Sequence, residues 1–305
     1  MRFSLTEDQV ALRDAVRDLL AQTPAESVWD ALARLGIFAS AVPRADGGLG
    51  LSDVDLVPLL MEIGYAAPPH PVAETILAAS LLAGDPRLGE VMSGERRVAV
   101  AGPDGLVPYG GDLVLVLDEA VRLVTPLSST VERSVDPGRA ILRARLPGGG
   151  VVSDDVPGTR RRADLASAAQ LVGLGRRMLE LTIAYVQTRQ QFGVPVGSFQ
   201  AVKHHCANAL LELEFAAPAV LAAGWSLASR TADAARAVSM AALLAREAAT
   251  RTARLAIQCH GAMGYTVEYE LHRFAKRAWA LSATIDIDEH LDRIAESLSL
   301  EGARP

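Results

Sequence analysis

Apolar residues of the first part of the chain, residues 1–92, recur every three or four positions, which is the spacing of one helix face. Thr6 followed by Gln9 forms the sequence of a capping box, so a helix is expected to begin there. Glycines and prolines separate the helical segments, and Gly36 and Gly64 are expected to end two of them. The segments that follow the first helix are expected at residues 28–35, 54–63 and 72–82.

The pattern changes in residues 93–157, where short runs rich in β-branched and aliphatic residues are separated by Gly, Pro and Asp. These runs cover residues 97–101, 113–117 and 140–144. They predict a small middle β-domain.

Long helical patterns return in residues 158–305. They cover residues 165–187, 199–229 and 233–260, and a fourth begins near residue 268 and continues with interruptions. Long helices with short connections predict an up-down four-helix bundle. The predicted fold class is therefore α+β and mostly α, with an N-terminal helical domain, a reduced middle β-domain and a C-terminal helical bundle.

Composition narrows the function. The 305 residues are half hydrophobic and carry a net charge of −6, which argues against a nucleic-acid partner. Cys206 and Cys259 cannot build a disulfide framework, and without a Cys/His ligand cluster we expect no metal site. The longest uncharged run, residues 215–229, contains Pro218 and is too short to span a membrane. No basic and apolar signal opens the chain, so we expect a cytoplasmic protein without a membrane partner.

Between the first two long helices lies an elbow with the pattern R-x-x-F-G, formed by Arg189, Phe192 and Gly193. Gln200 follows just after it. An arginine fork suits a phosphate and a phenylalanine face suits a flat base. The alternative is structural, with Arg189 near the negative end of the helix dipole as part of a C-cap.

A second stretch lies at the end of the third long helix and reads Q-x-x-G-x-x-G-Y-T-x-E-Y, beginning at Gln258 and Gly261. In its order and its separation from the elbow, the pair of motifs resembles the C-terminal domain of acyl-CoA dehydrogenases. The resemblance implies a flavoenzyme that uses FAD to dehydrogenate the Cα–Cβ bond of an acyl-CoA thioester and passes electrons to an electron-transfer flavoprotein. It covers nearly the whole chain.

In that family, the matching residues bind the ADP half of a flavin that is seated on the neighbouring subunit. The resemblance therefore makes the cofactor-binding candidates Arg189, Phe192, Gln200, Gln258 and Gly261. The second glycine of the family's pair is Ala262 here. The middle domain also departs from the family, because it lacks the T-E-P-x-x-G-S-D-like and W-I-T/S-like segments that hold the flavin ring and its ribityl chain.

The resemblance also directs the search for a catalytic base. The usual glutamate position is occupied by Ile285, with Asp286 and Asp288 nearby in the wrong context. A smaller group of relatives carries its base eleven residues before the motif glutamine, and that position is Glu247 here. The alternative is a solvated helix glutamate paired with Arg246 or Arg251.

The shortened form is similar to subunits of actinobacterial heteromeric acyl-CoA dehydrogenases that act on steroid side-chain CoA thioesters. It implies a longer acyl-CoA dehydrogenase-like partner in a two-plus-two heterotetramer, with a homotetramer as the alternative. The alanine-rich segment 241–256 is one candidate for the interface. Two other functions stay open, namely a non-catalytic subunit that completes the partner's FAD site and a flavin-free helical scaffold.

Overall fold

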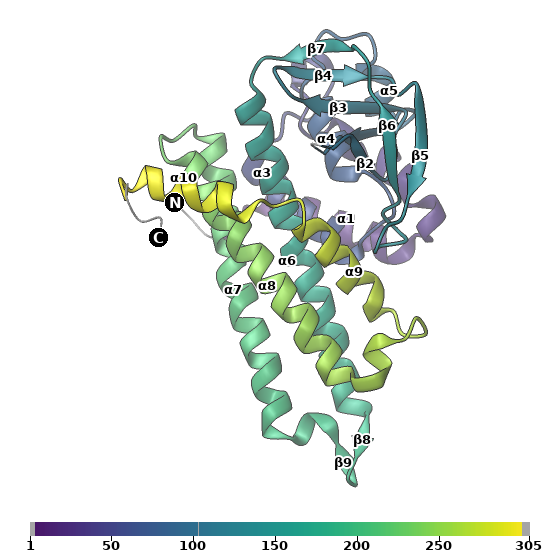
Figure 1. Cartoon of the computed structure of the whole chain (residues 1–305), viewed down its shortest axis with the longest axis vertical. Coiled ribbons are helices and arrows are strands. Elements are labelled where there is room, and N and C mark those ends of the chain that lie inside the picture. The colour runs from purple at the N-terminus through teal and green to yellow at the C-terminus, as the bar shows by residue number, and fades with distance from the viewer. Residues whose placement is uncertain (1–3, 103, 301–305) are drawn as a thin grey trace.

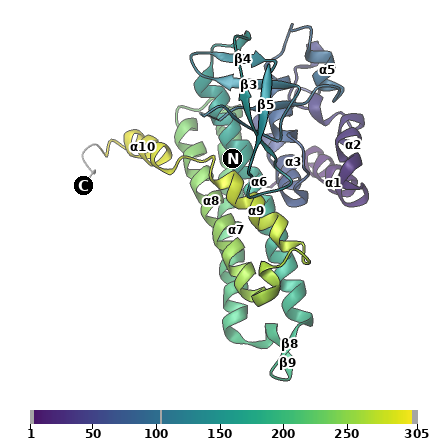
Figure 2. The ribbon, with the colours of Figure 1, turned by 45° about the vertical axis from the view of Figure 1, so that its right-hand side comes forward.

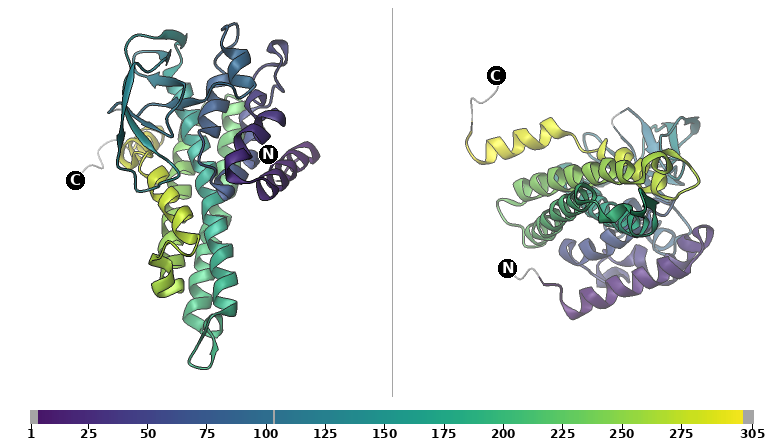
Figure 3. Two further views of the ribbon diagram at one scale, coloured as in Figure 1. Left: turned by 90° about the vertical axis from the view of Figure 1, so that its right-hand side faces the viewer. Right: turned by 90° about the horizontal axis from the view of Figure 1, so that it is seen from below.

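The computed structural model describes residues 4–102 and 104–300. A small β-domain lies at one end of a long helical bundle, and the N-terminal helices pack on the side of that bundle (Figures 1 and 2). Seen from below, the N-terminal helix and the C-terminal helix lie on opposite sides of the bundle (Figure 3). This arrangement confirms the predicted fold class.

The N-terminal part is helical, as predicted. Thr6 caps the first helix through a complete capping box with Gln9. Gly36 follows the second helix in a left-handed conformation with φ of 81°. The helices are α1 (Glu7–Gln22), α2 (Val28–Arg34), α3 (Asp53–Ala66), α4 (Val72–Ala79) and α5 (Leu88–Met92).

The expectation that Gly64 ends α3 is wrong, because the helix continues to Ala66. The glycine serves a contact instead. A Cβ at Gly64 would lie 2.1 Å from the carbonyl oxygen of Gln170, and a Cβ at Gly173 would lie 1.9 Å from that of Met61. The backbones of α3 and the first bundle helix therefore touch at these two glycines.

The described residues of the middle domain form two small sheets. One has the strand order β1-β3-β4-β7, in which only the β1–β3 pair is parallel, and the other is antiparallel with the order β2-β6-β5. The three predicted runs are β1, β3 and β6, whereas the other four strands were not predicted because they are short and partly polar. The strands are β1 (Val98–Val100), β2 (Leu106–Pro108), β3 (Leu113–Leu117), β4 (Val121–Val124), β5 (Ser128–Glu132), β6 (Ile141–Arg145) and β7 (Gly150–Ser153).

The C-terminal bundle is built on one long helix, α6, which begins at its cap Asp155 and packs against α3, α7, α8 and α9. The predicted fourth helix is divided in two, and the last segment, α10, lies across the bundle (Figure 1). The helices are α6 (Val156–Thr188), α7 (Gln200–Ala228), α8 (Ala234–His260), α9 (Leu271–Ser282) and α10 (Ile287–Ser297).

The alanine-rich face of α8 is not an outer surface. Ala241, Ala245, Ala249 and Ala253 are fully buried inside the chain, where their small side chains allow α6 and α7 to approach closely. The proposed interface on this face is therefore wrong.

The helix α7 instead carries large apolar side chains on its outer face, namely Leu210, Leu211 and Phe215, which are 49%, 56% and 67% exposed. By length and composition alone α7 could cross a membrane, and 33% of its most apolar window is buried. Core helices of soluble proteins pass the same test. In the described part of the chain, no other element covers the apolar outer face of α7.

The glycine contact between α3 and α6 generates a stability prediction. Gly173→Ala should lower the free energy of unfolding by about 3 kcal/mol, the upper part of the usual cost of overpacking, because the neighbours are backbone atoms. Chemical denaturation would measure this. The control is Gly89→Ala in α5, where nothing lies within 4 Å of an added Cβ. A Gly173→Ala midpoint equal to that of the wild type would contradict the proposed role of the contact.

Candidate functional site

The elbow forms a short hairpin at the far tip of the bundle (Figure 1). Its strands β8 (Gln190–Gln191) and β9 (Val194–Pro195) pair antiparallel, and Phe192 and Gly193 make the two-residue turn. Their φ angles are 55° and 80°, so both are left-handed, as the tight turns of hairpins require.

Phe192 is an unusual residue for this turn. A left-handed conformation costs a non-glycine residue about 1–2 kcal/mol, and the ring is 92% exposed. Its one ring neighbour among the described residues is Phe199, edge-on at 6.1 Å. A strained and solvated aromatic ring contributes nothing to this chain's own core, so we infer that it serves a contact outside the chain.

Arg189 stands at the base of the hairpin, just after α6. Its backbone N–H donates to Tyr185 and its carbonyl accepts from Val196, at 2.9 and 2.7 Å. The side chain is exposed, and no carboxylate in residues 4–102 or 104–300 pairs with it. The guanidinium is therefore available to an anion from outside the chain.

The second motif lies where α8 ends. Gln258 and Gly261 are exposed. Gly261 has φ of 58° and ψ of −133°, a conformation that side chains disfavour, and an added Cβ there would meet nothing within 4 Å. Ala262 is also exposed, so its methyl group does not fill the open side of the motif.

An aromatic cluster that the sequence did not predict brings the two motifs to the same end of the bundle. The ring of Tyr185 stacks on His260 at 4.3 Å, and Tyr269 lies 4.9 Å from His260. Burial lowers the pKa of His260, and its Nδ1 lies 2.7 Å from the carbonyl oxygen of Ala256. The neutral ring thus donates a hydrogen bond to that carbonyl and packs against the two tyrosine rings. In the sequence, the one sign of this cluster is Tyr185, an aromatic residue four positions before Arg189.

Gln200 begins α7 beside the hairpin. Its amide nitrogen lies 3.4 Å from Nε2 of His204, one turn further along the helix. The side chain is exposed, so it can also turn toward a ligand at the elbow.

Glu247 lies apart from these residues. It precedes Gln258 by eleven positions on α8, which corresponds to roughly 16 Å along the helix. Its Oε1 lies 2.5 Å from Nε of Arg251, and Nη1 of Arg251 lies 2.9 Å from Glu212. The Glu247 side chain is 53% exposed. This is the surface ion pair that the sequence left open as the alternative.

Asp286 caps α10 by accepting from the backbone N–H of Glu289 at 3.1 Å, and this role explains an aspartate near the usual base position. Asp288 lies in the first turn of the same helix, where a negative charge suits the helix dipole.

The junction between the middle domain and the bundle is closed by a buried ionic pair. Arg277 of α9 donates to Asp136, with side-chain exposures of 6% and 4%, and to the carbonyl of Pro68 at 3.0 Å. Arg139 donates to the carbonyl of Ala280 at 3.4 Å. Burial raises the pKa of the nearby Tyr109 to about 12, which keeps its hydroxyl neutral. The middle domain is thus fastened directly onto α9.

Two family models match this chain. The acyl-CoA dehydrogenase N-terminal domain matches residues 6–86 and the acyl-CoA dehydrogenase C-terminal domain matches residues 162–285. The two matched ranges flank the middle β-domain.

Curated relatives agree. IpdE2, an acyl-CoA dehydrogenase of Mycobacterium tuberculosis, is 32% identical over 89% of this chain and 86% of its own length. FadE34, an acyl-CoA dehydrogenase of the same organism, is 34% identical over 91% of this chain, which spans only 42% of FadE34.

Solved structures show the same fold. A chain of the ChsE4-ChsE5 complex from Mycobacterium tuberculosis is 26% identical with a TM-score of 0.87, and the match covers 100% of both chains. A chain of the steroid acyl-CoA dehydrogenase Tcur3481-Tcur3483 is 25% identical with a TM-score of 0.82, over 98% of this chain and 99% of that one. Together with the two motifs at the tip of the bundle, these matches show that the chain belongs to the acyl-CoA dehydrogenase family.

Proposed function

We propose that this chain is one subunit of a heteromeric acyl-CoA dehydrogenase and that it completes an FAD site whose flavin ring is held by a longer partner chain. Acyl-CoA dehydrogenases are oxidoreductases that act on acyl-CoA with FAD as the cofactor. One observation carries the proposal. The side chains of the elbow are exposed to solvent, whereas the charged side chains between the middle domain and α9 are buried and paired with each other.

The residues of the tip fit the ADP half of FAD. The guanidinium of Arg189, which has no carboxylate partner in the described part of the chain, can donate two hydrogen bonds to a pyrophosphate, and the exposed face of Phe192 can cover a flat base. At Gly261 the backbone is open to a close approach, since even an added Cβ would find empty space. Gln258 and Gln200 supply amide donors and acceptors at the same end of the bundle.

The other half of FAD has no matching residues in this chain. The family's flavin-ring segments are missing from the sequence, and the middle domain meets α9 through Asp136 and Arg277 with their charges paired and buried. Opening that contact would leave a buried charge without a partner, which is costly. This supports placing the flavin ring on the partner.

A bound FAD would supply the acceptor for the hydride from Cβ of the acyl-CoA, while a carboxylate base would take the proton from Cα. The part of this chain is to bind and orient the cofactor from the far side of the subunit interface. The substrate we propose is a steroid side-chain acyl-CoA, since two similar structures are a ChsE4-ChsE5 complex and a steroid acyl-CoA dehydrogenase named for two components. A two-plus-two assembly, an electron-transfer flavoprotein as acceptor and a cytoplasmic location belong to the same proposal.

The outer face of α7 is the surface we assign to the partner. It exposes Leu210, Leu211 and Phe215, and α7 begins at Gln200, one short 3-10 turn (Val196–Ser198) after the hairpin. A chain that covers this face therefore lies beside the residues that serve its cofactor. Large exposed apolar patches on soluble proteins mark such contacts.

The first test concerns the cofactor. Arg189→Ala should lower the FAD affinity of the co-expressed complex about tenfold or more, because a hydrogen bond to a charged group is worth roughly 1.5–3 kcal/mol. Flavin content after dialysis measures it. Arg34→Ala, which removes an exposed arginine in α2, is the control and should retain FAD. Equal retention in both variants would overturn the cofactor role of Arg189.

The second test concerns assembly. Phe215→Glu should prevent co-purification with the partner, since a charge would have to be buried in an apolar interface. The fold should be unaffected because the side chain is exposed. Leu127→Glu in the middle domain, where Leu127 is 68% exposed, provides a matched control. A Phe215→Glu chain that still binds the partner would show that the interface lies elsewhere.

A second candidate function is dehydrogenation by this chain itself with Glu247 as the base, which the spacing to Gln258 favours. In that case Glu247→Gln should keep FAD and acyl-CoA binding but lower turnover by at least about 100-fold. If Glu247 only pairs with Arg251, turnover should stay at the wild-type value, and the base would be assigned to the partner. Steady-state kinetics of the assembled enzyme distinguish the two outcomes.

A further inference from the structure

A cavity of about 830 Å³ lies between the N-terminal helices and the bundle, and neither cofactor motif uses it. It is lined by side chains of α1, α2, α3, α6 and α9 and by the segments that follow α1 and α3. Its α6 residues precede Arg189 by about thirteen positions, which corresponds to roughly 20 Å along the helix. The volume falls in the range of small-molecule sites, about 300–1,000 Å³.

The cavity has an excess of positive charge in an acidic protein. Four arginines (17, 176, 177 and 273) and three glutamates (62, 180 and 270) line it, so its formal charge is 4 − 3 = +1, whereas the whole chain carries −6. A local reversal of this kind attracts an anion.

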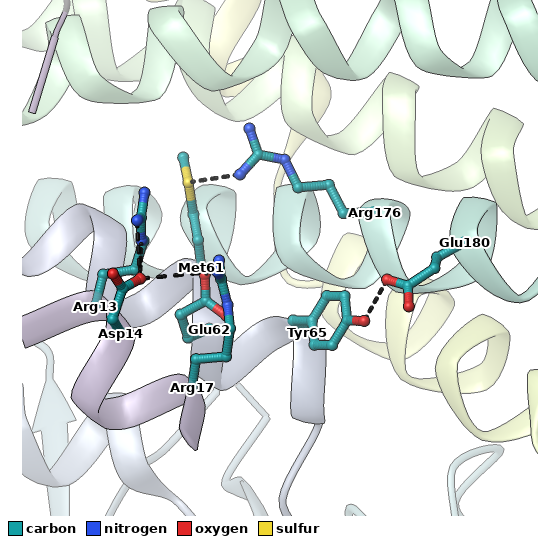
Figure 4. A network of polar contacts seen from close by, with 8 residues as sticks. All are labelled: Arg13, Asp14, Arg17, Met61, Glu62, Tyr65, Arg176 and Glu180. Carbon is teal, nitrogen blue, oxygen red and sulfur yellow. Dashed lines mark hydrogen bonds and ion pairs between the residues drawn. The ribbon is translucent and has the colours of Figure 1, made fainter. Parts of the chain in front are cut away.

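Each of the three glutamates has a hydrogen-bond donor inside the cavity, and two of them, Glu180 and Glu270, share the single positive charge of Arg177. Arg17 donates two hydrogen bonds to the buried Glu62, at 3.0 and 2.6 Å (Figure 4). Glu270 accepts from Arg177 at 3.0 Å. Glu180 accepts from the Tyr65 hydroxyl, as Figure 4 shows, and lies 3.7 Å from Arg177.

Two of the arginines have no carboxylate partner among the described residues. The one polar contact that the described residues offer the Arg176 guanidinium is the weak acceptor Sδ of Met61 at 3.9 Å (Figure 4). Arg273 is exposed, and its guanidinium lies 5.7 Å from the ring centre of Phe274 without a carboxylate from the described part of the chain. The uncompensated charge in the cavity is therefore cationic.

The remaining walls are apolar or aromatic. Leu20, Val28 and Ala66 line the cavity, and Tyr65 and Phe274 present rings over which the Arg177 guanidinium stacks at 5.3 and 5.6 Å. Rings and guanidinium planes favour flat ligands. We propose that this cavity binds a small anion with a flat apolar body, whose charged group is held by Arg176 and Arg273. This inference does not depend on the proposed subunit role.

The test uses two fluorescent probes of the same shape on the purified chain. 8-Anilinonaphthalene-1-sulfonate carries one anionic group, and N-phenyl-1-naphthylamine is the same flat body without it. The anionic probe should bind with one site per chain and at least about tenfold more tightly than the neutral one. The double variant Arg176→Gln/Arg273→Gln should remove that preference.

The controls separate this site from others. The double variant Arg34→Gln/Arg133→Gln removes two exposed arginines elsewhere and should keep the preference. Arg189→Ala should keep it too, so a failure of the cofactor proposal is distinguishable from a failure here. Thermal unfolding verifies that each variant is folded. Equal binding of the two probes, or an anionic preference that survives loss of Arg176 and Arg273, would overturn the proposal.

Discussion

The helical frame of this chain depends on the backbone contact between α3 and α6 at Gly64 and Gly173. No side chain fits between these helices there, since an added Cβ would lie about 2 Å from a carbonyl oxygen in either case. The contact fixes the N-terminal helices to α6, and α6 then extends for 33 residues as one continuous helix. Its middle forms one wall of the arginine-lined cavity and its end carries the hairpin. The positions of both sites thus follow from one close approach.

The charged side chains at the two ends of the bundle differ in burial and in pairing. At the middle-domain end, Arg277 and Asp136 neutralise each other in a buried pair. At the hairpin end, Arg189 and Phe192 are left to the solvent in a strained turn. A chain that used only its own residues would gain stability from a better turn residue than phenylalanine. The strained conformation of Phe192 has a functional reason if the hairpin reaches a cofactor on another subunit.

Much of the frame could be predicted from sequence because its signals are local. The capping box at Thr6 and the apolar spacing of the long helices depend on residues a few positions apart, and the R-x-x-F-G pattern marked the hairpin. The prediction that Gly64 ends α3 failed because the sequence around a glycine that permits a close helix contact can look the same as the sequence around one that ends a helix. The alanines of α8 were placed on the wrong side for a similar reason, since small residues permit packing within or between chains.

Other features could not be found locally. Asp136 and Arg277 are 141 positions apart, and the cavity draws its walls from five helices. For Glu247 the sequence offered both a base and an ion pair, and only the position of Arg251 in space shows which contact the side chain makes.

We propose that this chain supplies one half of a flavin site and that a partner supplies the other. Flavin quantification combined with light scattering tests it most directly, on the chain alone and on the chain co-purified with a longer acyl-CoA dehydrogenase-like subunit. We expect no retained FAD in the isolated chain and one FAD for every two chains in the complex. One FAD per chain in a pure preparation of this protein, together with dehydrogenase activity, would contradict it.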